Sequence, residues 1–173
     1  VYPGKVGQAL SFNGTSASVN LGQPAVLQTL NAPMTISSWV RFPTAPVSGH
    51  NYTIIGRGYD WQIEILPTQK VSFRRWSSYS DVQGVSALSA TSWYHVVVTV
   101  FTSGSDNVLI YVNGQLDKTG TMTTPFNTSA SNTRISGYIQ ADIDYFNGLI
   151  DEVRIYNRAL SAAEIATLYN MGR

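Results

Sequence analysis

The sequence predicts an all-β fold: a two-sheet antiparallel β-sandwich of the jelly-roll kind, with one short C-terminal helix. Short segments rich in Val, Ile, Tyr, Phe, Trp and Thr recur along the chain, turn signals separate them, and helical periodicity appears only near the end. The 173 residues are enough for one domain. We therefore expect residues 1–173 to form a single domain, which is a module of a larger protein.

Ten segments have the composition of β-strands. Apolar and β-branched residues alternate with polar ones, or run together for a few positions, as a pleated and half-buried surface requires. The best hairpin signal is Asn113-Gly114, because both residues tolerate the positive φ angles of a type I′ turn. The ten predicted strands are residues 9–14, 17–22, 34–42, 52–58, 61–66, 70–76, 93–101, 107–115, 133–139 and 148–156.

One segment, ALSAAEIATLYN (159–170), has the pattern of a helix. Ser161 and Glu164 form an S-x-x-E capping box, in which each side chain satisfies a backbone N–H of the first turn. Apolar residues then recur at helical spacing on one face. This face predicts a short terminal helix that packs on the sandwich through Leu160, Ile165, Leu168 and Tyr169.

Composition and charge exclude several classes of function. Charged residues make up 12% of the chain, about half the usual share, and the net charge is +1, so we expect no nucleic-acid partner. The absence of cysteine excludes a disulfide scaffold, a thiolate metal site and a cysteine nucleophile. No apolar run approaches the roughly 18 residues of a membrane span, so we expect no membrane partner. We also expect the protein to be a monomer.

The closing stretch FNGLIDEVRIYNRALSAAEIATLYN (146–170) resembles the end of laminin-G-like jelly-roll domains of the concanavalin A-like lectin and glucanase superfamily. Those domains close on a strand of the form f-G-x-i-D-E-v-r-i-Y-n-r-a-L-s, followed by a helix carrying E-i. Segments 7–22, 34–42 and 92–116 resemble the family's F-D-G, T-i-s-a-W and W-h-H-v-a-v-t strands. The resemblance covers most of residues 7–170 and implies a concanavalin A-like jelly roll.

The resemblance also implies a structural calcium ion (Ca2+), bound by Asp151 together with the residue at the F-D-G aspartate position. That position holds Asn13, which supplies an oxygen without the charge, so we expect weaker binding than with Asp. The alternative is that Asp151 caps backbone amides in a turn. Asp151 and Glu152 are neighbours on a strand and point to opposite faces, so they do not form the acid–base pair of a glycosidase.

Residues 57–90 match no shared pattern of the family, and variable segments are where such domains differ in ligand. In KVSFRRW (70–76), alternation places Arg74 and Trp76 on one strand face, opposite Val71 and Phe73. An aromatic ring stacks on the apolar face of a sugar, while Arg and Asp bind its hydroxyls. The alternative is an ordinary set of aromatics on a sheet surface. The predicted carbohydrate ligands in this segment are Trp76, Arg74, Trp61, Arg57, Tyr59, Asp60 and Tyr79.

A second aromatic cluster, YIQADIDYF (138–146), precedes the closing strand. Its Tyr138, Asp144 and Tyr145 form either a second wall of the same site or a solvated turn. Trp39 and Trp93, which lie at family positions among apolar neighbours, are predicted to be core residues. His95, which alternates in phase with Trp93, is predicted to be a packed and hydrogen-bonded residue rather than a catalyst.

Together these features favour a non-catalytic carbohydrate-binding module that targets a secreted bacterial polysaccharide-degrading enzyme to its glycan. Its partners would be a polysaccharide or oligosaccharide and a covalently linked catalytic domain, a glycoside hydrolase or polysaccharide lyase, outside the cell or at its surface. One alternative is a protein-binding adhesion or structural domain. Another is a glycan-cleaving enzyme of the same superfamily, whose carboxylates would come from Asp60, Glu64, Asp142 and Asp144.

Overall fold

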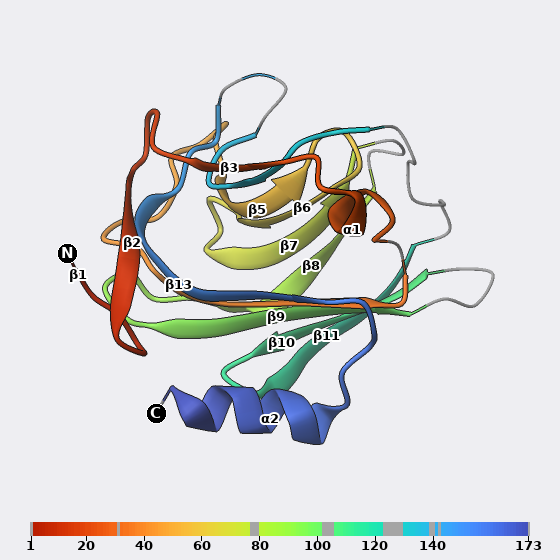
Figure 1. Cartoon of the computed structure of the whole chain (residues 1–173). Coiled ribbons are helices and arrows are strands. Elements are labelled where there is room, and N and C mark those ends of the chain that lie inside the picture. Colours follow the sequence, from red (N-terminus) through yellow and green to blue (C-terminus); the bar gives the residue numbers. More distant parts are fainter. Residues whose placement is uncertain are drawn as a thin grey trace.

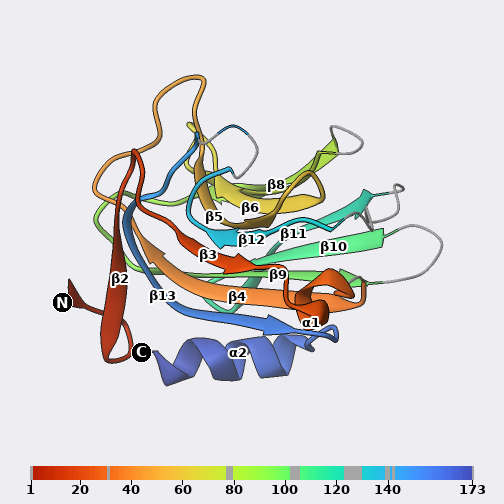
Figure 2. The same cartoon turned by 45° about the horizontal axis from the view of Figure 1, so that its top comes forward.

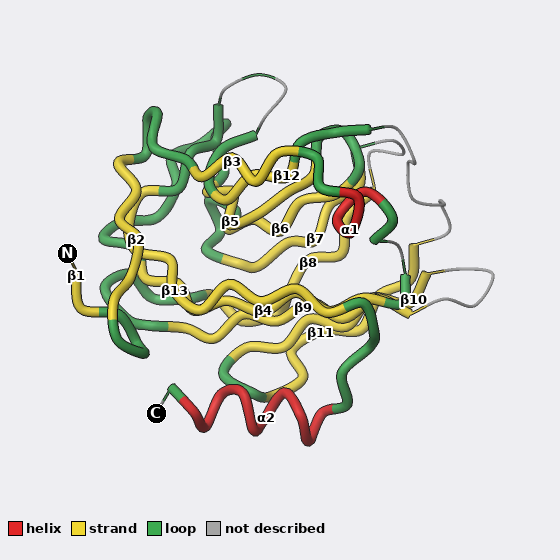
Figure 3. Tube along the Cα trace, in the orientation of Figure 1, coloured by secondary structure: helices red, strands yellow, loops and turns green. Residues whose placement is uncertain are grey.

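Two antiparallel β-sheets lie face to face, and helix α2 covers the outer surface of one of them (Figures 1 and 2). Strands dominate the chain, as the yellow segments of Figure 3 show. The computed structural model confirms the predicted all-β sandwich with a C-terminal helix. Of residues 106 and 107 only the backbone is described. The described residues are 2–30, 32–76, 80–101, 106–122, 130–138, 141 and 143–172.

Over these residues one sheet has seven strands and the other has six. The seven-stranded sheet has the spatial order β1 (Tyr2–Pro3), β2 (Gln8–Asn13), β13 (Asn147–Tyr156), β4 (Met34–Arg41), β9 (Tyr94–Phe101), β10 (Asp106–Val112) and β11 (Gln115–Met122). The six-stranded sheet has the order β3 (Val19–Gly22), β12 (Thr133–Ile135), β5 (Tyr52–Arg57), β6 (Trp61–Ile65), β7 (Lys70–Arg75) and β8 (Ser80–Ala87). A single helical turn, α1 (Ala25–Gln28), joins the two sheets between β3 and β4.

Each of the ten predicted segments overlaps one of these strands. The predicted hairpin is confirmed as well: Asn113 and Gly114 join β10 to β11 with φ angles of 51° and 78°. Strands β1, β8 and β11 were not predicted. Strand β8 buries few apolar side chains, Val82 among them, so its sequence carries little hydrophobic signal.

The main hydrophobic core fills the space between the sheets. Alternation along each strand decides which side chains enter it, because successive residues point to opposite faces. Strand β4 contributes Met34, Ile36 and Val40 from one side, and β6 contributes Ile63 and Ile65 from the other. The residues that alternate with these point to the outer surfaces of the sheets, and those of the six-stranded sheet become important for the functional site.

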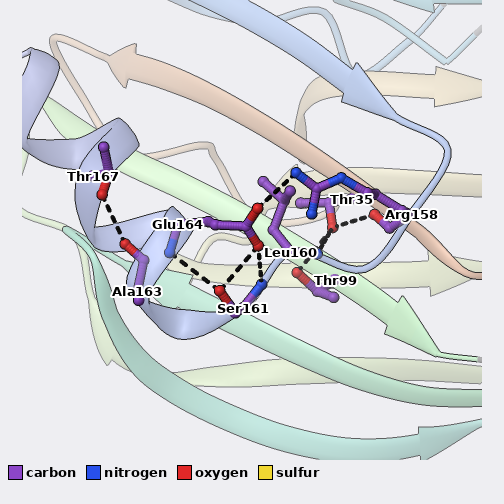
Figure 4. A network of polar contacts seen from close by, with 8 residues as sticks. All are labelled: Thr35, Thr99, Arg158, Leu160, Ser161, Ala163, Glu164 and Thr167. Atoms are coloured by element: carbon purple, nitrogen blue, oxygen red, sulfur yellow. Dashed lines mark hydrogen bonds and ion pairs between the residues drawn. The ribbon is translucent and has the colours of Figure 1, made fainter.

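Helix α2 (Ala162–Met171) begins with the predicted capping box. The Ser161 hydroxyl accepts a hydrogen bond from the Glu164 backbone N–H, and the Glu164 carboxylate accepts one from the Ser161 N–H (Figure 4). The Thr35 hydroxyl of β4 accepts from the Leu160 N–H at 2.9 Å, which fixes the entry into the helix. Ile165 then packs against the outer surface of the seven-stranded sheet. Among the described residues, no helix has the length and apolar character needed to cross a membrane.

Trp39 is buried as predicted, with 3% of its surface exposed, but it lies beneath α2 rather than between the sheets. Its indole contacts the His95 ring at a centroid distance of 5.1 Å and stacks on Tyr169 of α2 at 5.6 Å. His95 is buried and 2.8 Å from the Ser37 hydroxyl, which confirms its prediction as a packed, hydrogen-bonded residue. Trp93 is only half-buried, in the turn before β9, so its prediction as a core residue is wrong.

Candidate functional site

The outer face of the six-stranded sheet carries a continuous set of polar side chains. On β7, Val71 and Phe73 are fully buried in the core, and Arg74 points the other way, as the alternation predicted. Strands β6 and β8 pair with β7 so that Gln62 lies beside Arg74 on one side and Asp81 on the other. We call this surface the outer face; it comprises Gln62, Glu64, Ser72, Arg74, Trp76, Asp81 and Gln83.

Three aromatic rings gather at one end of the outer face. The Trp76 indole stacks on the Tyr138 ring, with centroids 4.7 Å apart and planes 14° apart. Tyr59 meets the same Tyr138 ring edge-on at 6.2 Å. Tyr138 is buried and Trp76 is half-buried, whereas 54% of Tyr59 is exposed. Of the three aromatic side chains, Tyr59 therefore presents the largest surface to solvent.

The polar groups beside these rings are held in fixed positions. The Trp76 Nε1–H donates to the Gln62 side-chain oxygen at 2.7 Å, and the Arg74 guanidinium lies 5.1 Å from the centre of the indole. Arg74 Nε is also 3.1 Å from Glu64 Oε1, in an ion pair that lacks hydrogen-bond geometry. The Asn51 side-chain amide donates to Glu64 Oε2 at 3.0 Å. Together these contacts hold the planar polar groups of Gln62, Arg74 and Glu64 in place when no ligand is bound.

Glu64 is the most perturbed carboxyl of this site. It is fully buried, and this loss of hydration raises its pKa from the ordinary 4.5 to about 7, although the positive charge of Arg74 and the hydrogen bond from Asn51 act in the opposite direction. The negative charges of Asp144 and Asp81 add to the rise. Glu64 was predicted only as a catalytic candidate, although the alternation in WQIEI places it on the same face as Arg74.

A pocket of about 320 Å³ opens at the rim of the sandwich, which we call the rim pocket. Residues of three segments line it, 13–15, 47–52 and 144–147. Inside it, Asp144 Oδ1 accepts a hydrogen bond from the Asn51 backbone N–H at 3.0 Å and lies 3.5 Å from Nδ1 of His50. Two of the predicted carbohydrate ligands, Asp144 and Tyr145, belong to this pocket.

The rim pocket and the outer face are adjacent. Asn51 contacts both, because its backbone N–H binds Asp144 and its side chain binds Glu64. Tyr138 and Asp144 also connect the two, since Tyr138 stacks on Trp76 and Asp144 lies in the pocket. The Tyr138 N–H donates to the Ile143 carbonyl at 2.7 Å. The structure therefore brings together Trp76, Arg74, Tyr59, Tyr138, Asp144 and Tyr145 of the predicted ligands.

The structure corrects three of the predicted carbohydrate ligands and leaves a fourth undescribed. Trp61 is 1% exposed and belongs to the core between the sheets. Arg57 and Asp60 form a buried ion pair, and Arg57 also donates to the Gln28 carbonyl at the end of α1. Such groups stabilise the fold and present no surface to a sugar. Tyr79 lies outside the described residues.

The two predicted calcium ligands do not lie together. Asn13 pairs with Asn147 on β13, whereas Asp151 lies four residues farther along that strand, or roughly 13 Å at the rise of a β-strand. The Asp151 carboxylate accepts backbone N–H groups of Lys5, Val6 and Glu152.

Asn13 Oδ1 likewise accepts the N–H groups of residues 15, 16 and 17. Because these oxygens already accept N–H donors, the two residues do not fit a shared calcium ion. The described residues also contain no cluster of three or more His, Cys, Asp or Glu side chains that could hold a metal.

A family model described as the concanavalin A-like lectin/glucanases superfamily matches residues 13–166. A comparison with curated protein sequences finds no match. Similar folds occur among solved structures, at sequence identities that support likeness of fold alone.

One of these structures is domain 4 of AbnA, an extracellular arabinanase of Geobacillus stearothermophilus, in complex with arabinotriose. Its TM-score is 0.71 at 20% identity, over 97% of this chain and 79% of that one. Another comes from botulinum neurotoxin type C, whose cell entry depends on interaction with two ganglioside molecules (TM-score 0.68, 19% identity, 94% of this chain and 42% of that one). A third is the binding domain of Paraclostridial Mosquitocidal Protein 1, with a TM-score of 0.72 at 18% identity, over 98% of this chain and 45% of that one. The chain thus spans less than half the length of the toxin structures.

Proposed function

The chain belongs to the concanavalin A-like lectin/glucanase superfamily, and from this premise we propose that it is a non-catalytic carbohydrate-binding module with its site on the outer face. One observation carries the proposal: an exposed Tyr59 ring meets the Tyr138 ring of the Tyr138–Trp76 stack, and the Arg74 guanidinium lies over the Trp76 ring of the same stack. A sugar unit has an apolar face that suits a ring and hydroxyls that suit fixed polar groups, and this arrangement offers both.

The polar side chains of the outer face are preorganised, which favours binding. The half-buried Arg74 and Trp76 are held in place from below, Arg74 by the buried Glu64 and Trp76 by the buried Gln62. A ligand that binds preformed groups avoids the entropic cost of ordering them, which is about 0.5–1.5 kcal/mol for each flexible side chain. The weak forces between a sugar and a protein surface make this saving important.

The described carboxylates support binding rather than cleavage. A glycosidase needs a proton-donating carboxyl within reach of the glycosidic oxygen, and a carboxyl with a raised pKa is the usual donor. Glu64 has the raised pKa, but it is fully buried and its two oxygens face Arg74 and Asn51. A sugar chain bound on the outer face would therefore contact the side chains that cover Glu64, and the carboxyl of Glu64 could not donate a proton to it.

The solved relatives support the same proposal. The arabinanase domain was solved with arabinotriose and belongs to an extracellular enzyme, and the type C neurotoxin interacts with gangliosides. By analogy, this module would be secreted by a bacterium and linked to a polysaccharide-degrading enzyme. It would raise the effective concentration of that enzyme on its glycan without doing chemistry itself.

Affinity gel electrophoresis against a panel of polysaccharides tests the proposal. We expect at least one glycan to retard the protein, and Tyr59→Ala to reduce this retardation at least roughly tenfold. Tyr2→Ala is the matched control, because Tyr2 is 53% exposed but lies on β1 at the edge of the other sheet. A protein that no glycan retards, or a Tyr59→Ala variant that migrates like the wild type, would contradict the proposal.

A further inference from the structure

We infer that the rim pocket is a second subsite that takes one uncharged sugar unit of the same glycan chain whose other units lie on the outer face. This inference rests on the proposed function and adds a ligand class to it.

The pocket has the size and the wall that a single sugar unit needs. Its volume of about 320 Å³ falls at the lower end of the roughly 300–1,000 Å³ of ligand pockets. The side chains of Tyr52 and Tyr145 line it, and both are half-buried. Tyr145 is held in place from behind, since a β-carbon at Gly137 would lie 2.8 Å from its ring. A ring supported in this way is a fixed apolar wall for a sugar.

The pocket also offers hydrogen-bonding groups that the described part of the protein does not use. Asp144 Oδ1 is engaged by Asn51, but no described residue donates a hydrogen bond to Oδ2. The Asn147 side-chain amide likewise makes no hydrogen bond to a described residue, and the His50 side chain is 57% exposed. A carboxylate oxygen accepts from a hydroxyl, and an amide both donates and accepts, so two neighbouring hydroxyls of a sugar match Asp144 and Asn147.

The backbone fixes the carboxylate of Asp144 in this position. Asp144 has a φ angle of 57°, in the left-handed region that non-glycine residues rarely adopt, although Asp is among the residues that tolerate it. Its carbonyl accepts the Thr53 N–H at 2.9 Å and its carboxylate accepts the Asn51 N–H, so the residue is tied to β5 and to the segment before it. The acceptor oxygen is therefore in place before a ligand arrives.

Charge in and near the pocket favours an uncharged sugar. Asp144 lies inside, and the Glu64 carboxyl is close enough for the two charges to interact. A uronic acid or sulfated unit in the pocket would place a negative group next to the Asp144 carboxylate, which costs free energy in a partly desolvated site. Arg74 does not compensate for this, because Glu64 already pairs with it.

The position of Asn51 between the pocket and Glu64 implies that one glycan chain can contact both sites. A unit in the pocket and units on the outer face would then bind as parts of one ligand, and the second contact would form at high effective concentration. Affinity should therefore rise when the chain becomes long enough to occupy both sites. A single sugar should bind much more weakly.

The test measures binding of neutral arabino-, xylo-, manno- and gluco-oligosaccharides, from mono- to hexasaccharide, and of galacturonic-acid oligomers, by isothermal calorimetry. Thr15→Trp fills the pocket from an exposed lining position, and Ser18→Trp places the same ring in the same loop outside the lining. Asp144→Asn keeps the size and the tolerance of positive φ but removes the charge. Melting curves confirm that each variant is folded.

We expect a neutral hexasaccharide to bind more tightly than the disaccharide. Thr15→Trp and Asp144→Asn should each weaken hexasaccharide binding at least roughly tenfold, whereas Ser18→Trp should not. Wild-type affinity in Thr15→Trp and Asp144→Asn, or tightest binding of an acidic oligomer, would overturn the inference and leave the outer face intact as a site. Absence of binding to every oligomer would overturn the proposed function and the inference with it.

Discussion

The indole ring of Trp76 lies stacked on the ring of Tyr138, with 4.7 Å between their centroids, and its Nε1–H is bound to Gln62. Trp76 was predicted to be a solvent-facing platform for a sugar. The structure instead gives it a supporting role, because the ring is half-buried and its polar atom already has a partner. The neighbouring Tyr59, 54% exposed, is the most accessible of the three rings to solvent.

The first prediction is that Trp76→Ala destabilises the domain, by about 2 kcal/mol, which is roughly half the cost of deleting a fully buried Trp. The loss comes from the stack with Tyr138 and the hydrogen bond to Gln62. Trp76→Phe keeps a ring and should lose only about 1 kcal/mol. Urea denaturation measures both, with Tyr59→Ala expected within about 0.5 kcal/mol of the wild type. If Trp76→Ala also falls within this range, the ring has no structural role.

The second prediction is that Trp39→Ala destabilises the domain more than Trp76→Ala does, by roughly 3–5 kcal/mol. Trp39 is almost fully buried between β4 and α2 and contacts both His95 and Tyr169. Its removal leaves a cavity under the helix, so α2 should also become more accessible to proteases. Thermal unfolding and limited proteolysis measure the two effects. Equal destabilisation by the two Trp variants would contradict the different burial of the two rings.

The faces of the strands could be read from the sequence, but the contacts between distant segments could not. Alternation in KVSFRRW placed Arg74 and Trp76 opposite Val71 and Phe73, and the structure agrees. The same rule places Trp61 of WQIEI in the core with Ile63 and Ile65. The prediction of Trp61 as a carbohydrate ligand was therefore wrong because it disregarded this alternation.

The stacking of Tyr138 on Trp76, by contrast, could not be predicted from the sequence. These residues are 62 positions apart in the sequence, and the contact depends on how the segment before β13 folds over the sheet. No local pattern encodes such a contact. The same holds for Asn51, which connects Asp144 with Glu64 through one backbone and one side-chain hydrogen bond. Sequence periodicity therefore predicted the sheets, while the site required their three-dimensional arrangement.

The third prediction concerns Asp151, whose carboxylate holds the Lys5 and Val6 N–H groups of the N-terminal segment. Charge-assisted hydrogen bonds of this kind contribute about 1.5–3 kcal/mol each, so Asp151→Ala should lower the melting temperature. We expect EDTA to leave the melting temperature of the wild type unchanged, because the carboxylate is already satisfied. A fall in the melting temperature with EDTA that Asp151→Ala abolishes would instead support the calcium ion predicted from the sequence.

The fourth prediction is that Glu64 makes stability fall as the pH rises from 4.5 to 7. Its pKa is about 7 in the folded protein and 4.5 ordinarily, so in this range the folded state holds a proton that the unfolded chain has released. The free energy of unfolding then decreases by up to about 1.4 kcal/mol per pH unit. Glu64→Gln should remove this contribution, so in urea titrations the free energy of unfolding of the variant should change with pH in the upward direction relative to the wild type. A variant that keeps the wild-type profile would show that Glu64 is ionised throughout.

The last prediction is that His95 opposes Glu64, so that the stability of the wild type changes little between pH 4.5 and 6.5. Burial, and to a smaller extent the positive charge of Arg154, lower the pKa of His95 from the ordinary 6.5 to about 4. Between these values the unfolded chain binds a proton that the folded state does not, so stability rises with pH, with a slope of sign opposite to that of Glu64. Glu64→Gln should therefore reveal a rise in the free energy of unfolding across this range, and His95→Gln should reveal a fall, whatever each substitution costs at a single pH. Urea titrations at half-unit intervals of pH measure the two slopes. Slopes of the same sign in both variants would contradict the assignment of these two groups as opposing contributions.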